Sequence, residues 1–184
     1  MTEGVDVPEG NSRRLNRMVA VTVVVLSVAM AVGNIKDGNI CQTMQADQAS
    51  KIDLWNEYQA TRIKARDQAN AAVILGQFTT PSAAAAVAKA NAEAMRHDAE
   101  SASLKQQAIA AQDDYDIQGR RDDQFDLAEG FMSICLALAG ISALIESFGL
   151  LCLSWGAGAF GLLFLVAGFE SLPIHPDRLV AFLT

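Results

Sequence analysis

The chain has 184 residues, of which 51% are hydrophobic and 19% charged, and its formal net charge is −7. Residues 18–35 carry no formal charge and residues 130–169 carry only Glu146, so most of the charge falls between two apolar segments. This segregation argues against a soluble globular enzyme, and the lack of a basic patch with interleaved aromatic residues argues against nucleic-acid binding.

The first apolar segment, residues 18–35, follows an N-terminal tail of residues 1–17. A helix needs roughly 20 apolar residues to cross the hydrocarbon core of a bilayer, so this segment is just long enough for one transmembrane helix. A cleaved signal peptide ending at Ala29-Met30-Ala31 is the competing interpretation, in which residues 1–31 would be removed. Against it, the apolar run continues past Ala31 and the leader contains acidic residues.

The second apolar segment is long enough for two transmembrane helices, which we place at residues 125–146 and 149–169, before a C-terminal tail of residues 170–184. We expect a tight turn at Glu146-Ser147-Phe148-Gly149, where Gly149 can adopt a positive φ angle. Small residues spaced four apart, among them Gly158 with Ser154 and Gly161 with Ala157, predict close packing of these helices.

Residues 36–124 separate the apolar segments and predict a water-exposed, antiparallel helical hairpin resembling a coiled coil. Thr80 followed by Pro81 is a helix-start signal, so the first arm should run from about residue 41 to 75 and the second from Pro81 to residue 118. We expect Gly119 to end the second arm, and the charged residues 120–126 to form a solvated hinge.

The second arm carries a seam of mostly small residues at alternating spacings of three and four, the coiled-coil period. An Ala-rich seam buries little area, and a flexible Ala-rich linker over residues 82–94 is an alternative interpretation. The first arm is bulkier, with apolar groups on more than one face, so one face could contact a second subunit. The seam residues are Val87, Ala90, Ala94, His97, Ser101, Leu104, Ala108, Ala111 and Tyr115.

No motif predicts catalysis, a cofactor or a metal. The three cysteines and two histidines show no zinc or disulfide spacing, and the glycine pattern at residues 156–161 lacks the strand that a dinucleotide fingerprint requires. The residues expected to make interactions are Trp55, Tyr58, Arg62, Leu104, Glu146, Gly158 and Gly161.

The motif Trp55-x-x-Tyr58-Gln59-Ala60-x-x-Ile63-Lys64 resembles a bacterial membrane protein family filed as domain of unknown function 4337. Asn16-Arg17 before the first apolar segment and Phe125-Asp-Leu-Ala-Glu129 before the second also match that pattern. Because the family has no assigned activity, the resemblance implies membrane residence and architecture but no chemistry.

These features together predict an all-α, multi-pass protein of the cell inner membrane. Arg13, Arg14 and Arg17 favour a cytoplasmic N-terminus, with the hairpin and the C-terminal tail on the other side. The leading hypothesis is a non-enzymatic scaffold or accessory subunit whose partners are the lipid bilayer and either like subunits or another membrane protein. The alternative is an oligomeric channel or transport accessory in which Glu146 forms an acidic ring.

Overall fold

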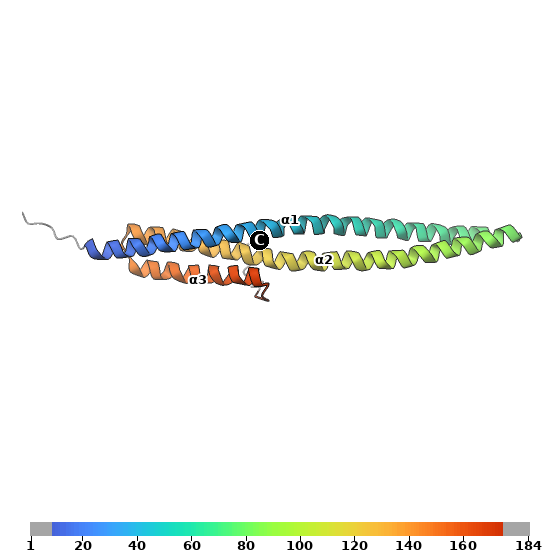
Figure 1. Cartoon of the computed structure of the whole chain (residues 1–184). Coiled ribbons are helices and arrows are strands. Elements are labelled where there is room, and N and C mark those ends of the chain that lie inside the picture. Colours follow the sequence, from blue (N-terminus) through green and yellow to red (C-terminus); the bar gives the residue numbers. More distant parts are fainter. Residues whose placement is uncertain (1–8, 175–184) are drawn as a thin grey trace, which may run out of the picture. The chain divides into compact units, whose positions relative to one another are not determined.

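The computed structural model describes residues 9–174, and over that range the chain is all-helical, without strands. Helix α1 spans Glu9–Leu75, α2 spans Pro81–Leu144 and α3 spans Phe148–Glu170 (Figure 1). The chain divides into two units: unit 1 combines residues 1–42 with residues 118–184, and unit 2 comprises residues 43–117. The outer parts of both expected tails, residues 1–8 and 175–184, lie outside the described residues.

Both long helices continue without interruption from an apolar segment into a polar one. α1 passes through Gly33 and Gly38, and α2 passes through Gly119 and the charged residues after it. The expected helix end at Gly119 and the expected hinge at residues 120–126 are therefore wrong. A glycine within a helix costs only about 1 kcal/mol relative to alanine, which neighbouring packing can offset, so Gly119 alone does not end α2.

The start of α2 was predicted correctly. The backbone N–H of Ala83 donates to the side-chain Oγ1 of Thr80 at 3.2 Å, and the N–H of Ala84 donates to the Thr80 carbonyl at 3.1 Å. Pro81 occupies the first helical position, where its missing N–H costs nothing because that donor has no partner within the helix. The connection between α1 and α2 therefore has a defined beginning and end.

In unit 2, α1 and α2 contact each other in antiparallel order. The Lys51 ammonium donates to Gln112 at 2.9 Å and lies 5.0 Å from the centre of the Tyr115 ring, and Arg62 lies 3.8 Å from Asp98. The seam predicted on α2 is confirmed, since all of its residues are buried or half-buried.

α1 has a matching seam that the sequence analysis missed, because several of its members are polar. These positions also follow spacings of three and four and are buried or half-buried in unit 2. In the register set by the contacts above, Tyr58 lies level with Leu104 and Thr61 with Ser101. The α1 seam consists of Met44, Asp47, Lys51, Leu54, Tyr58, Thr61, Ala65, Gln68, Ala72 and Leu75.

The turn between α2 and α3 in unit 1 differs in detail from the expectation. Glu146 adopts the left-handed conformation with φ 54°, whereas Gly149 is an ordinary helical residue of α3. Ser147 is the N-cap of α3 and accepts from the Leu150 N–H at 3.4 Å, and the Ser142 hydroxyl donates to the Ser147 carbonyl at 3.0 Å. The cap begins α3 immediately after Glu146, so Glu146 itself must reverse the chain direction.

The close approach of α3 to α2, predicted from small residues, is confirmed at Gly158 and Gly161. A Cβ atom added to Gly161 would lie 2.6 Å from Cγ of Met132 and 3.0 Å from its backbone nitrogen, and one added to Gly158 would lie 2.9 Å from Sγ of Cys135. The Ser154 hydroxyl donates to the Cys135 carbonyl at 2.7 Å. At this contact the backbones themselves come together, as in many membrane helix pairs.

All three helices contain a stretch long and apolar enough to cross a membrane. In unit 1 many large apolar side chains on these stretches are exposed, for example Val24 at 63% and Leu153 at 62%. Apolar side chains that face outward over the whole of a helical bundle are typical of a lipid-facing surface.

Substituting Gly161 with alanine should lower the stability of unit 1 by about 1–3 kcal/mol, because the new methyl group meets the backbone of α2. Gly156 is the matched control, since a Cβ added there has nothing within 4 Å. Thermal unfolding of the two variants in detergent, followed by circular dichroism, compares them. Equal melting temperatures would contradict the close approach.

Candidate functional site

The residues expected to make interactions occupy separate places in the structure. Trp55 and Tyr58 form an edge-to-face pair with ring centres 5.5 Å apart on α1, and Arg62 is the partner of Asp98. Leu104 is buried in the seam of unit 2, at 7% exposure. These four residues belong to unit 2, whereas Glu146, Gly158 and Gly161 belong to unit 1. No single site contains them all.

A surface pocket in unit 2 contains two of the α1 residues that were expected to make interactions, Tyr58 and Arg62. It is lined by Tyr58, Gln59, Arg62, Ile63 and Arg66, all on α1. The pocket joins the edge of the seam to the outer face of the helix, where Ile63 is 58% exposed. It therefore marks the part of α1 that has both cationic and apolar groups available to a partner.

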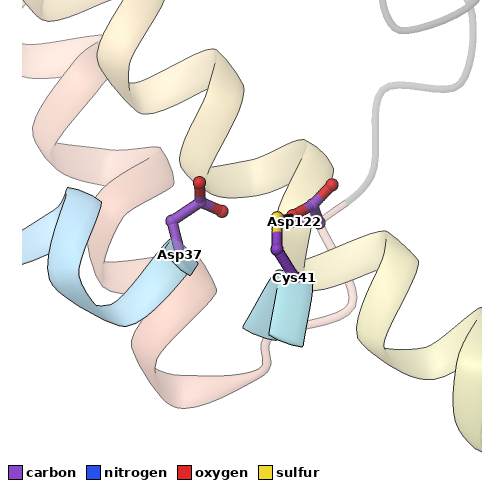
Figure 2. Close-up of side chains that lie close together, drawn as sticks. All are labelled: Asp37, Cys41 and Asp122. Atoms are coloured by element: carbon purple, nitrogen blue, oxygen red, sulfur yellow. Dashed lines mark hydrogen bonds between the residues drawn. The ribbon is translucent and has the colours of Figure 1, made fainter. Parts of the chain in front are cut away.

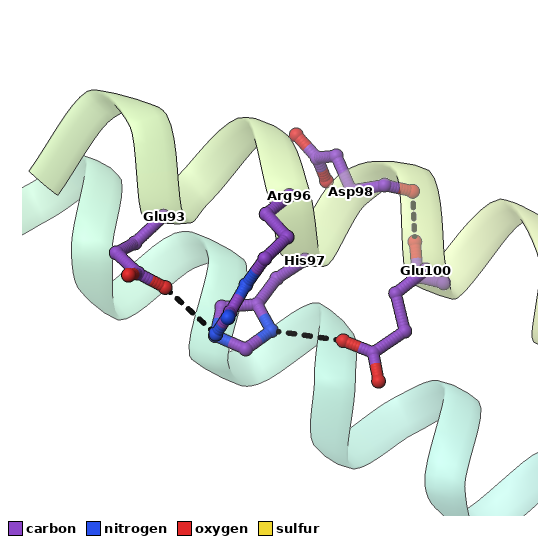
Figure 3. Close-up of polar contacts among 6 residues, drawn as sticks. Glu93, Arg96, His97, Asp98 and Glu100 are labelled. Atoms are coloured by element: carbon purple, nitrogen blue, oxygen red, sulfur yellow. Dashed lines mark hydrogen bonds and ion pairs between the residues drawn. The ribbon is translucent and has the colours of Figure 1, made fainter. Parts of the chain in front are cut away.

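Polar side chains on the neighbouring part of α2 bond mainly to residues one turn away on the same helix (Figure 3). Arg96 lies 2.7 Å from Glu93, and Nδ1 of His97 lies 3.2 Å from a carboxylate oxygen of Glu100. The Ser101 hydroxyl donates to the Asp98 carbonyl at 2.8 Å. His97 is thus a half-buried seam residue with a local carboxylate partner.

Unit 1 contains a cluster that the sequence analysis did not identify, formed by Asp37, Cys41 and Asp122 (Figure 2). One ligand atom from each residue lies within 4.8 Å of the other two. The Cys41 thiol donates to Oδ1 of Asp122 at 3.1 Å. Asp37 and Cys41 are one turn apart on α1, and Asp122 reaches them from α2.

The carboxylates in and around this cluster carry like charges and repel one another. Burial, together with Asp122 and the nearby Asp126 and Glu129, raises the pKa of the Asp37 carboxyl to about 6. The hydrogen bond to Asp122, followed by burial, raises the pKa of the Cys41 thiol to about 11. Oδ1 of Asp37 is buried and has no hydrogen-bond partner. At neutral pH the cluster therefore holds negative charge that its surroundings do not fully compensate.

The chemistry of these groups argues against binding of a soft metal. Thiolate, not thiol, is the form that binds soft metals, and a pKa of about 11 keeps Cys41 protonated. The two carboxylates are hard oxygen donors of the kind that divalent cations prefer, and they are the residues here that could hold one. The raised pKa of Asp37 instead lets this carboxyl keep its proton closer to neutral pH than an ordinary aspartate does.

The charged residues that were expected to form a hinge have a structural role at the end of α3. Nε of Arg121 donates to the Gly168 carbonyl at 3.2 Å, and the Gln124 amide donates to the carbonyls of Leu172 at 2.8 Å and Ile174 at 2.7 Å. The last carbonyls of a helix lack partners within it, so Arg121 caps α3 from α2, whereas Gln124 holds the segment that follows the helix end at Glu170. Gln124 is only 2% exposed despite its polar amide.

A spacing signal could have revealed the acidic cluster. Asp37 with Cys41 and Asp122 with Asp126 are two pairs of residues four apart, and each pair borders an apolar segment. When α1 and α2 pair antiparallel, the end of the first apolar segment lies beside the start of the second. Asp122 and Asp126 were instead expected in a solvated hinge, and no pairing was expected for Asp37 and Cys41. Glu146, in contrast, lies where expected, exposed in the turn between α2 and α3.

Substituting Asp37 with Asn should stabilise the protein at neutral pH and have little effect in mild acid. A native pKa raised from 3.8 to about 6 means that the native state holds its proton longer, so stability is lost as the pH rises through this range. Asn imitates the protonated carboxyl, so we expect a gain of about 1 kcal/mol near neutral pH, allowing for solvent screening.

Melting temperatures in detergent at about pH 4.5 and about pH 7.5 test this sign. Asp53→Asn, an exposed position on the same helix, is the matched control and should show no difference between the two pH values. A gain for Asp37→Asn that is equal at both pH values would contradict the raised pKa.

A search of curated proteins and a search of solved structures each found no significant match. A sequence profile of the family described as Domain of unknown function (DUF4337) matches residues 15–171, which include all three helices from Leu15 onward and the acidic cluster. Since that match covers most of its length, the chain belongs to the DUF4337 family.

Proposed function

We propose that this protein is a non-enzymatic, multi-pass scaffold of the cell inner membrane. Residues 18–35, 125–146 and 149–169 would cross the bilayer, and residues 36–124 would form a helical hairpin in water. The hairpin would present its outer faces to like subunits or to another membrane protein.

The observation that carries the proposal is the continuity of α1 and α2. Each helix joins an apolar stretch long enough to cross a membrane to a polar stretch with a heptad seam. Each helix therefore continues from its apolar stretch directly into its polar stretch as one hydrogen-bonded element. This arrangement suits a protein that is anchored in a bilayer and displays a surface outside it.

The composition of the seam supports a role in assembly. Of the seam residues of α2, Ala90, Ala94 and Ala108 are buried, and alanine contributes much less hydrophobic free energy than leucine or isoleucine. Meanwhile large apolar side chains on α1, such as Ile63 and Ile74, remain exposed. A hairpin whose seam is mostly alanine buries little apolar area within one chain. Packing against a partner would bury the exposed isoleucines and so add hydrophobic stabilisation.

The alternative of a channel with an acidic ring at Glu146 has less support. Glu146 is exposed in the turn, a position that fits the water boundary of a membrane hairpin.

Cysteine labelling in membranes tests the proposed embedding. In a variant whose three native cysteines are replaced, Leu163→Cys and Phe78→Cys each introduce one thiol at a side chain that is 49% or 61% exposed in the structure. A membrane-impermeant maleimide should label Phe78→Cys from one side of the membrane only. It should not label Leu163→Cys from either side, because lipid covers that position.

Both variants should react fully after denaturation, which is the control for thiol availability. Labelling of Leu163→Cys at the rate of Phe78→Cys in intact membranes would refute the proposal. The side that labels Phe78→Cys also gives the orientation of the hairpin. If mild detergent then releases only monomer with no bound partner, the scaffold role fails even though the embedding stands.

A further inference from the structure

The outer face of α1 in unit 2, opposite the seam, carries one isoleucine every eleven residues. Ile52, Ile63 and Ile74 are 51%, 58% and 63% exposed. Eleven residues are close to three turns of an α-helix, so the three side chains lie on one line along the rod. This line has no partner within the described part of unit 2.

The outer face of α2 carries alanines at the same interval. Ala88, Ala99 and Ala110 are exposed and also lie eleven residues apart. Alanine leaves space beside a helix for a larger side chain of a neighbouring helix. One outer face of the hairpin thus carries a row of large side chains, and the other carries alanines at the same interval, with the exposed Met95 between Ala88 and Ala99.

The two rows are also in register. The contacts of Lys51 with Gln112 and of Arg62 with Asp98 set the register. Counted from them, Ile63 lies about level with Ala99, Ile52 with Ala110 and Ile74 with Ala88. Within one chain these residues cannot meet, because they are on faces that point away from each other across the seam. In two copies rooted in one bilayer by the same segments, however, equal residues lie at equal heights.

We propose that the isoleucine face of α1 in one copy packs against the alanine face of α2 in a second copy of this chain. Each isoleucine then meets an alanine at all three levels, without any shift along the membrane normal. This inference rests on the proposed function, because the shared bilayer sets the heights.

The contact is heterologous, since it joins two different faces. A heterologous contact repeats from copy to copy and produces a ring or a row, whereas a contact between two identical faces stops at a dimer. The two arrangements are therefore distinguishable by the products of cross-linking.

Disulfide cross-linking of the full chain in native membranes tests the inference. In the cysteine-replaced background, a chain with both Ile63→Cys and Ala99→Cys should form a ladder of dimers, trimers and larger species on mild oxidation. Either single variant should remain monomeric. Co-expressed single variants with different tags should form only the mixed dimer.

A second pair at another level, Ile74→Cys with Ala88→Cys, should give the same ladder and guards against local misfolding of the first. The matched control pairs Ile63→Cys with Ala92→Cys, an exposed alanine about two helical turns from Ala99, and should lose most of the cross-linking. Homodimers from Ile63→Cys alone, or a ladder of equal yield from the control pair, would overturn the proposed contact.

The labelling experiment separates this inference from the proposed function. Protection of Leu163→Cys without a ladder from either pair refutes the contact and leaves the membrane scaffold in place. Labelling of Leu163→Cys in intact membranes removes both.

Discussion

The antiparallel register of α1 and α2 is the constraint on which the other features depend. It begins at the capped start of α2, where Thr80 and Pro81 define the first turn, and it is visible in the pairing of Lys51 with Gln112 and Arg62 with Asp98. In unit 1 the same antiparallel order brings Cys41 to Asp122. Side chains on a helix recur with a fixed period. Once the register is set at one place, it therefore determines which residues of α1 and α2 lie opposite one another along both helices.

The two units use different kinds of contact. In unit 1, Gly158 and Gly161 allow the backbone of α3 to approach α2, and Ser154 adds a hydrogen bond to the Cys135 carbonyl. Such contacts depend on close packing and polar bonds, which act in lipid where the hydrophobic effect does not drive helices together. In unit 2 the contacts are a seam of alanines with a few large side chains and with polar pairs at its edges. Such a seam relies on water to drive burial, and it suits the charged composition of that part of the chain.

The acidic cluster lies where each long helix changes from apolar to polar. Asp37 is the second residue after the first apolar segment, and Asp122 precedes the second segment by a few residues. The register brings these two borders together, and burial then raises the pKa of Asp37. Nearby, Arg121 caps the end of α3 and Gln124 bonds to the segment after it, so the charged stretch of α2 that resembled a flexible hinge is a structural element.

Periodicity and punctuation in the sequence predicted much of the fold. The apolar segments, the start of α2 and the seam from Val87 to Tyr115 follow from composition, capping and the heptad period, all of which are local properties. The seam of α1 was not predicted because Lys51, Thr61 and Gln68 occupy buried or half-buried positions that hydrophobicity does not mark. Their burial depends on partners supplied by α2.

The course of the helices past glycine, and the cluster, were decided by tertiary structure. Gly119 reads as a helix end in isolation, yet α2 continues through it because packing on both sides outweighs its small local cost. Asp37, Cys41 and Asp122 are ordinary residues of charged flanks until two helices place them together. The sequence by itself determined which segments are apolar and where α2 begins. The tertiary structure determined which side chains meet, because contacts between distant residues depend on a register that no local pattern encodes.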